Sequence, residues 1–123
     1  MSDINIVEEI ITDNFDTAVL TVEGVIDANT ASIFENSLLN LINRGVINIL
    51  VDVEKVTYIS SAGLGAFMSA LDTLENKNNK GKISILKSSP QFIKVFNMMG
   101  FDEIFKSFNT IEEALKAWGK NGK

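Results

Sequence analysis

Two adjacent serines are the residues of this 123-residue chain that are best suited to chemistry. Ser60 and Ser61 follow an apolar segment and open an amphipathic helix, so a hydroxyl is expected beside the positive end of the helix dipole, where a phosphate group is stabilised. The next residues are small or apolar: Ala62, Gly63, Leu64 and Gly65. They would leave room for a large partner to reach the hydroxyl. The spacing alone fits a phosphorylation site and an ordinary serine cap equally well.

A carboxylate is the second candidate. Asp27 follows the second predicted strand and precedes the first predicted helix. In an open α/β sheet, functional groups collect beyond the C-terminal ends of the strands. Asp27 is therefore expected to face the serine segment or, as its residue type alone favours, to be a turn carboxylate or a helix cap.

The residue types that are missing exclude several kinds of active site. The chain has no histidine and no cysteine, which rules out a serine–histidine–aspartate triad, a thiolate nucleophile and a metal bound by histidine or cysteine. Gly63 and Gly65 are not followed by a third glycine at the dinucleotide-binding spacing, because Met68 stands there. No catalytic residue, metal or cofactor is therefore expected, and a small serine enzyme is the least favoured function.

Charge and hydropathy narrow the range of partners. The net charge is -5 and the pI about 4.6, whereas nucleic acids and anionic membranes attract basic surfaces. No signal-peptide pattern opens the chain, and no apolar stretch approaches the roughly 20 residues that cross a bilayer. We therefore expect a single cytoplasmic domain, residues 1–123, that binds neither nucleic acid nor membrane.

Strands and helices alternate along most of the chain. Strands are predicted from β-branched or continuous apolar runs at residues 4–11, 18–22, 46–51, 83–86 and 104–105. Helices are predicted after Asn29 or Thr30, Ser61, Ser89 and Thr110. This order predicts an α/β fold with right-handed parallel crossovers and an antiparallel strand at the N-terminus. A loop from Asp52 to Ser61 is expected to carry the site beyond the third strand.

The apolar spacing also predicts which helix faces are buried. The buried stripe of the second helix is expected to comprise Leu64, Phe67, Met68, Leu71 and Leu74. The stripe of the third is expected to comprise Phe92, Val95, Phe96 and Met99. Ile93 and Met98 lie on opposite flanks of that stripe, where they form either a second interaction surface or half-buried contacts. The latter is the more common arrangement.

Two segments of the chain carry a family pattern. One comprises residues 24–27, followed by Thr30 and Ala31, and the other comprises residues 51–53, 56 and 58–65. They are similar to the first and second signatures of the anti-sigma factor antagonists, or anti-anti-sigma factors, of the bacterial STAS domain family, which the chain resembles from the opening hairpin to the last helix. The resemblance implies a STAS-like single domain with a mixed, mostly parallel sheet of about five strands and about four helices.

The resemblance also implies a partner switch. In the family, the unphosphorylated protein binds an anti-sigma factor that is also a serine kinase, and the anti-sigma factor then releases its sigma factor. Phosphorylation of one serine breaks the complex, and a serine phosphatase restores it. Carried over by position, that serine is Ser61, with Ser60 as the alternative. The implied partner-binding surface comprises Asp27, Ser60, Ser61, Ala62, Gly63, Leu64 and Gly65.

The chain departs from the family pattern at two positions of this segment. Many members have aspartate where Ser60 stands, and serine or threonine where Ala62 stands. Ser60 therefore adds a rival hydroxyl beside Ser61 and removes a charge that a kinase would meet.

Two other regulatory functions are compatible with the pattern. One is a STAS subunit of a transporter or of another signalling assembly, without a sigma-factor role. The other is a phospho-aspartate receiver with Asp52 as its acceptor, because receivers share the size and the alternating elements. A receiver also needs an acidic cluster after its first strand, and here that strand ends in a hairpin near Asp13.

Overall fold

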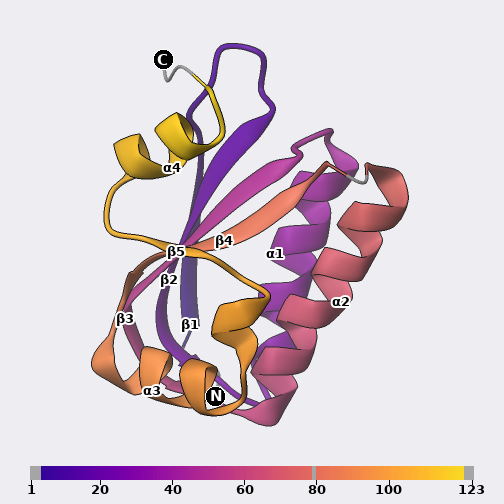
Figure 1. The fold of residues 1–123 in the computed structure, drawn as a ribbon. Helices are drawn as coiled ribbons and strands as arrows, with labels where there is room; N and C mark the ends of the chain where they lie inside the picture. Colours follow the sequence, from indigo (N-terminus) through magenta and orange to yellow (C-terminus); the bar gives the residue numbers. More distant parts are fainter. Residues whose placement is uncertain (1–3, 79, 121–123) are drawn as a thin grey trace.

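The computed structural model describes residues 4–78 and 80–120, which contain a five-stranded mixed sheet (Figure 1). Its strands are β1 (Ile4–Ile10), β2 (Thr17–Ile26), β3 (Asn48–Ile59), β4 (Lys82–Ser88) and β5 (Ser107–Phe108), and they lie in that order across the sheet. β1 is antiparallel to β2, and all other neighbours are parallel. The predicted α/β fold with an N-terminal antiparallel strand is confirmed.

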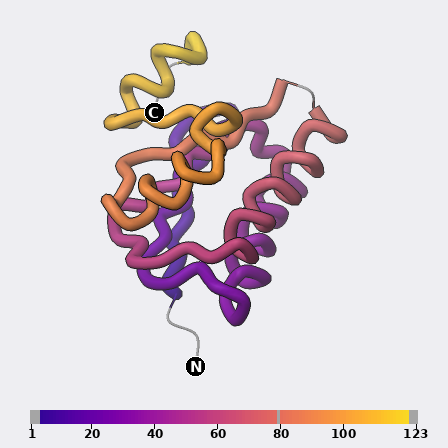
Figure 2. The backbone as a smooth tube through the Cα atoms, turned by 60° about the horizontal axis from the view of Figure 1, so that its bottom comes forward, coloured from indigo at the N-terminus to yellow at the C-terminus, as the bar shows by residue number. Residues whose placement is uncertain are grey.

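Helices cover both faces of the sheet. They are α1 (Ala31–Asn43), α2 (Ser61–Lys77), α3 (Pro90–Met98) and α4 (Ile111–Ala117), with a short 3-10 helix η1 (Phe101–Glu103). Side chains of α1, α2 and α3 join one large core with the strands, whereas α4 packs with Val19 and Leu50 in a smaller core on the opposite face. Figures 1 and 2 show α1 and α2 alongside each other and α4 apart from them.

Aromatic side chains hold the large core together. Phe67 of α2 lies at its centre, with ring centroids 4.9 Å from Phe34, 5.9 Å from Phe92 and 5.5 Å from both Phe96 and Phe105. All five side chains are fully buried. Aromatic pairs at such spacing add about 0.5–1.5 kcal/mol each beyond the burial of their area. This cluster fixes the first turns of α2 against the sheet.

β3 is longer than predicted and includes most of the expected loop. The predicted strand ends at Val51, but β3 continues to Ile59. Its register against β2 shifts twice beyond Asp52, so the inward-facing residues Val53, Val56 and Ile59 lie three apart instead of two. The alternation that identifies a strand in a sequence is thereby lost, and the prediction of a loop from Asp52 to Ser61 was wrong.

Two other strand predictions are also corrected. The second strand is predicted at residues 18–22 with its end near Gly24, but β2 runs to Ile26. The last strand is β5 and does not lie at residues 104–105, because the chain enters the core before it reaches the sheet edge. Phe105 is fully buried among the aromatic rings, and Ile104 beside it is 48% exposed.

Three methionines lie outside the core. Met68 and Met99 are predicted in buried stripes but are 38% and 57% exposed. Met68 lies about 100° around the helix from Phe67, beyond the face that contacts the sheet. α3 ends at Met98, so Met99 no longer continues its buried stripe. Met98 itself is 71% exposed, whereas Ile93 is partly buried against the core.

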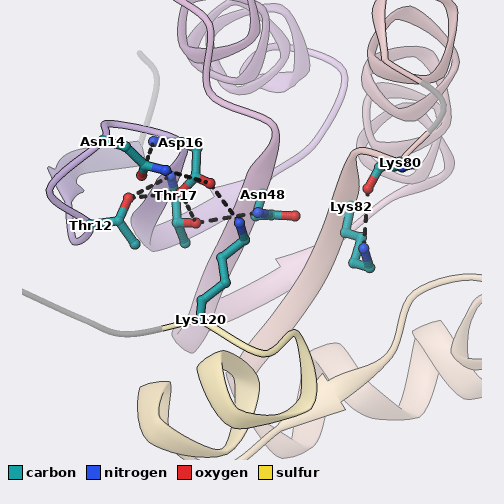
Figure 3. Close-up of polar contacts among 8 residues, drawn as sticks. All are labelled: Thr12, Asn14, Asp16, Thr17, Asn48, Lys80, Lys82 and Lys120. Atoms are coloured by element: carbon teal, nitrogen blue, oxygen red, sulfur yellow. Dashed lines mark hydrogen bonds and ion pairs between the residues drawn. The ribbon is translucent and has the colours of Figure 1, made fainter.

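A polar network closes the end of the sheet where β2 and β3 begin (Figure 3). Lys120 Nζ donates to Asp16 Oδ2 at 2.6 Å, and the hydroxyls of Thr12 and Thr17 donate to Asp16 Oδ1 at 2.9 and 2.8 Å. Burial opposes ionisation of this carboxyl, but these hydrogen bonds outweigh it and lower the pKa of Asp16 to about 2. The ion pair ties the segment after α4 to the β1–β2 turn.

Candidate functional site

The predicted site residues lie at the opposite end of the sheet, where β2 and β3 end. Ile26 of β2 pairs with Ile59 of β3, and the backbone N–H of Ser60 donates to the carbonyl of Ile26 at 2.9 Å. Asp27 and Ser60 each follow one of these paired residues. The parallel strands therefore bring the start of α1 and the start of α2 side by side, at the lower end of the molecule in Figure 1.

Ser60 is the N-cap residue of α2, but its hydroxyl does not cap the helix. Its backbone is extended, and its carbonyl accepts the first helical hydrogen bond from the N–H of Leu64 at 3.0 Å. The Ser60 Oγ is buried and has no hydrogen-bond partner among the described residues. Backbone hydrogen bonds therefore position the start of α2. The Ser60 hydroxyl is buried and does not contribute to this positioning.

Ser61 is the first helical residue of α2 and is exposed. The exposed residues Ala62 and Gly65 flank it on the same surface, and a Cβ built on Gly65 would meet no atom within 4 Å. The N–H groups of the first turn precede the first helical hydrogen bond, so they have no intrahelical partner. An exposed hydroxyl thus lies on open, uncrowded surface at the electropositive end of a 17-residue helix.

Gly63 and Leu64 support the site from inside. A Cβ on Gly63 would lie 2.7 Å from Ile26 Cγ2, 2.8 Å from Ile59 Cγ1 and 3.1 Å from the Ile26 carbonyl, so a glycine is needed for α2 to approach the strand ends. Leu64 is 4% exposed and belongs to the large core. Two residues of the predicted partner-binding surface, Gly63 and Leu64, are therefore buried. Ser61, Ala62 and Gly65 are exposed.

Asp27 organises the turn before α1. Its Oδ1 accepts from the N–H of Asn29 at 2.9 Å and from the N–H of Thr30 at 3.2 Å. The Thr30 hydroxyl accepts from the N–H of Asp27 at 2.9 Å and donates to the carbonyl of Val25 at 2.7 Å. Asp27 is therefore a turn carboxylate, one of the two roles that its residue type favoured, while Thr30 is the N-cap residue of α1 and makes no side-chain capping hydrogen bond. The turn holds a carboxylate in place beside the start of α2.

Sequence reasoning missed three exposed apolar side chains on the elements that meet at this end of the sheet. Tyr58 is 52% exposed near the end of β3, Ile33 is 43% exposed in the first turn of α1, and Met68 lies on α2. The signal for Met68 was present, because seven residues of helix bring it within about 20° of Ser61 around the axis. Tyr58 could not be assigned without the register shifts of β3.

Asp52, the acceptor that a receiver would need, lies inside β3 and not at a strand end. Burial raises its pKa, against the hydrogen bond that its Oδ1 accepts from the N–H of Glu54 at 3.1 Å. Within residues 4–78 and 80–120, no three histidine, cysteine, aspartate or glutamate side chains gather as a metal site. In the same part of the chain, no helix is long and apolar enough to cross a membrane.

Comparison with known proteins connects this geometry to a family. The STAS domain model matches residues 7–114. The anti-sigma-B factor antagonist of Staphylococcus aureus is 32% identical over 83 residues, which cover 68% of this chain and 75% of that protein. The anti-sigma-F factor antagonist RsfB of Mycobacterium tuberculosis is 25% identical over 105 residues, which cover 85% of this chain and 84% of RsfB.

Solved structures repeat the fold. SpoIIAA, an anti-sigma factor antagonist, aligns in its unphosphorylated form with a TM-score of 0.77 and 21% identity, over 95% of this chain and 99% of its own. The phosphorylated form of Bacillus SpoIIAA aligns with a TM-score of 0.67 and 24% identity, over 92% of this chain and 98% of its own. At these identities the likeness concerns the fold alone. Together, the model match over most of the sequence and the Staphylococcus relative show that the chain belongs to the STAS domain family.

Proposed function

We propose that this chain is an anti-sigma factor antagonist that works as a phosphorylation switch. In its unphosphorylated form it binds an anti-sigma factor with serine kinase activity, which then frees a sigma factor. A phosphate on Ser61 breaks this complex, and a serine phosphatase restores it. The chain supplies the acceptor and the docking surface in the cytoplasm and catalyses neither reaction. The names of its relatives in Staphylococcus aureus and Mycobacterium tuberculosis support the antagonist role.

The contrast between two neighbouring hydroxyls carries the choice of acceptor. A kinase must bring the acceptor oxygen into line with the phosphate that it transfers, so the oxygen must be reachable. Ser61 is exposed, whereas the Oγ of Ser60 is enclosed by the protein. This difference supports Ser61 as the phosphorylated residue.

The surface around Ser61 is suited to an apolar contact with a partner. Ala62 and Gly65 leave α2 almost bare on its outer side, and Tyr58, Ile33 and Met68 add exposed apolar area nearby. Small residues let a partner approach the helix closely, and aromatic and methionine side chains are enriched in interface cores. We therefore include Tyr58, Ile33 and Met68 in the proposed docking surface with Asp27 and the segment 60–65.

The switch acts by charge at this contact. A phosphoserine carries roughly -1.5 to -2 charges and three acceptor oxygens. In the free chain, the unpaired N–H groups of the first turn of α2 and the helix dipole stabilise that charge. In the complex, the same phosphate would be buried against the partner and beside Asp27, where desolvation and repulsion oppose it. The complex therefore dissociates while the fold stays the same.

Phosphosite mapping tests the proposal. The wild-type chain, Ser61→Ala and Ser60→Ala would each be incubated with ATP and candidate anti-sigma factor kinases of the same organism, then analysed by peptide mass spectrometry and pull-down. We expect phosphate on the wild type and on Ser60→Ala, no phosphate on Ser61→Ala, and capture of the kinase by unphosphorylated chain only. Phosphate on Ser60, or equal capture of both forms, would contradict the switch.

A further inference from the structure

β1 is the outer strand of the sheet on the side opposite β5. It pairs with β2 along its whole length, from Ile4 to Ile10, without a register shift, and no other strand of the described residues lies beside it. Four of its seven residues are exposed and the other three are half-buried, so β1 is not covered. A long, regular strand edge of this kind is a template for another extended chain.

The ladder with β2 determines which backbone groups of β1 point outward. The N–H of Ile11, which directly follows β1, donates to the carbonyl of Thr17 on β2 at 2.9 Å. Because successive residues of an antiparallel strand bond alternately to its two sides, every second residue back from Ile11 also bonds to β2. The residues between them direct their N–H and C=O groups away from β2, and these are Ile4, Ile6, Glu8 and Ile10.

We propose that this edge binds a second copy of the chain, with the two β1 strands antiparallel and the two Val7 residues opposite each other. In this register every outward-facing residue of β1 meets an outward-facing residue of the other copy. Ile4 lies opposite the partner's Ile10, and Ile6 lies opposite the partner's Glu8. The two five-stranded sheets then form one continuous sheet across a two-fold axis.

Charge and the length of the pairing select this register. A two-fold axis at Glu8 would place two carboxylates opposite each other, and like charges in that position destabilise a sheet. A two-fold axis at Ile6 would leave one end of each β1 without a partner on the other β1. With the axis at Val7, by contrast, Glu9 lies opposite Asn5, whose side-chain amide can donate to a carboxylate.

Side chains on both faces of β1 would gain contacts. Three isoleucines on one face are only partly buried against the large core, and the pairing would extend that core across the axis: Ile4, Ile6 and Ile10. On the same face, the ion pair of Glu8 with Arg44 at the end of α1 offsets the repulsion between the Glu8 carboxylates of the two copies. On the other face, Val7 is 58% exposed and would pack against its counterpart in the closely spaced, non-hydrogen-bonded kind of pair.

The proposed dimer leaves the surface around Ser61 open. Because the two β1 strands run antiparallel, the ends of the two sheets that carry Ser61 point in opposite directions. Each copy therefore keeps its own phosphorylation site and docking surface. The dimer proposal stands or falls independently of the switch.

Disulfide cross-linking tests the register, because the chain has no cysteine of its own. Val7→Cys and Glu9→Cys would each be exposed to oxidised glutathione, and both positions are exposed on the same face of β1. The two Val7 positions lie within reach of a disulfide, whereas the two Glu9 positions lie four residues apart along the strands, about 14 Å. We expect Val7→Cys to form the covalent dimer at least about tenfold faster than Glu9→Cys. Equal rates would overturn the proposed pairing.

Charge at the two-fold axis provides the second arm. In sedimentation experiments up to about 1 mM protein, we expect the dimer fraction of the wild type to rise with concentration. Val7→Lys and Val7→Glu should each weaken the dimer by about tenfold or more, because like charges meet at the axis, and an equimolar mixture of the two should restore it. Restoration also shows that both variants fold. Val7→Thr, an uncharged control of similar shape, should associate as the wild type does.

Two results of the sedimentation experiments contradict the proposal. One is a wild-type chain that remains monomeric up to about 1 mM. The other is undiminished association of both charged variants, which would place the contact between copies on a surface other than β1.

Discussion

Two helices of this protein begin in nearly the same way and use their first serine differently. Ser60 precedes α2 and Ser89 precedes α3, each in extended conformation at the end of a parallel strand. The Ser89 Oγ accepts from the N–H of Phe92 at 3.1 Å and donates to the carbonyl of Val56 at 2.5 Å. The Ser60 Oγ makes no such bond among the described residues. One hydroxyl therefore belongs to the fold, and the other contributes nothing to it.

The difference explains how a helix start is kept available for function. In the first turn of α3, the Ser89 side chain accepts one N–H, and Pro90 has none. Few N–H groups are therefore left at the N-terminus of α3 to bind a ligand. α2 is instead held by the packing of Gly63 on Ile26 and by backbone bonds, and its first N–H groups stay free of side-chain caps. A phosphate on Ser61 can use these groups without competing with a structural hydrogen bond.

The largest expected effect is on binding at α2. Ser61→Asp should weaken binding of the anti-sigma factor by about 100-fold or more, because it places a charge in an apolar contact. Its free energy of unfolding should stay within about 0.5 kcal/mol of the wild type, because a helix N-terminus tolerates negative charge. Calorimetric titration and thermal unfolding measure the two quantities. Ser61→Ala is the control and should bind normally; equal binding by Ser61→Asp would move the switch elsewhere.

Two glycines in the first turns of α2 have different surroundings. Gly63 packs against the strand ends, and Gly65 faces open space. Gly63→Ala should lower the free energy of unfolding by about 1–3 kcal/mol, because its Cβ would press on Ile26 and Ile59. Gly65→Ala should leave it unchanged or raise it by about 1 kcal/mol, because its Cβ enters open space and improves helix propensity. Urea unfolding of both variants checks the contrast. Similar values for the two would mean that α2 shifts easily away from the strands.

Removal of the Ser89 hydroxyl should lower the free energy of unfolding without changing the binding of the anti-sigma factor. Ser89→Ala leaves the N–H of Phe92 without its acceptor and the Val56 carbonyl without a donor, which costs about 1–3 kcal/mol. Chemical denaturation measures this loss, and binding of the anti-sigma factor at low temperature should be unchanged. A variant as stable as the wild type would show that α3 does not depend on its cap.

The smallest effect is expected at Ser60. Ser60→Ala should change the free energy of unfolding by no more than about 0.5 kcal/mol, since no hydrogen bond of the Oγ is lost. The same denaturation series provides the measurement, with Ser89→Ala as its reference. A loss comparable to that of Ser89→Ala would show that Ser60 caps α2 in solution, and the contrast between the helices would disappear.

Local patterns were sufficient for much of the architecture. The order of strands and helices followed from apolar runs and caps, and the predicted caps at Ser89 and Thr110 both form, with Thr110 accepting from the N–H of Glu113 at 3.1 Å. These features depend on residues a few positions apart, which interact in the same way in most folds. The placement of Asp27 and Ser60 at the same end of the sheet followed from the same order.

The remaining features depend on residues that are far apart in the sequence. The second half of β3 could not be identified because two register shifts against β2 replace the alternating pattern with inward residues three apart. Met68 is exposed because of how α2 docks on the sheet, not because of its own hydropathy. Ser89 has a structural role because its hydroxyl donates to the carbonyl of Val56, which lies 33 positions away in the sequence. A hydroxyl becomes part of the fold only where tertiary packing brings it a hydrogen-bond partner, and among residues 4–78 and 80–120 the Ser60 hydroxyl has none.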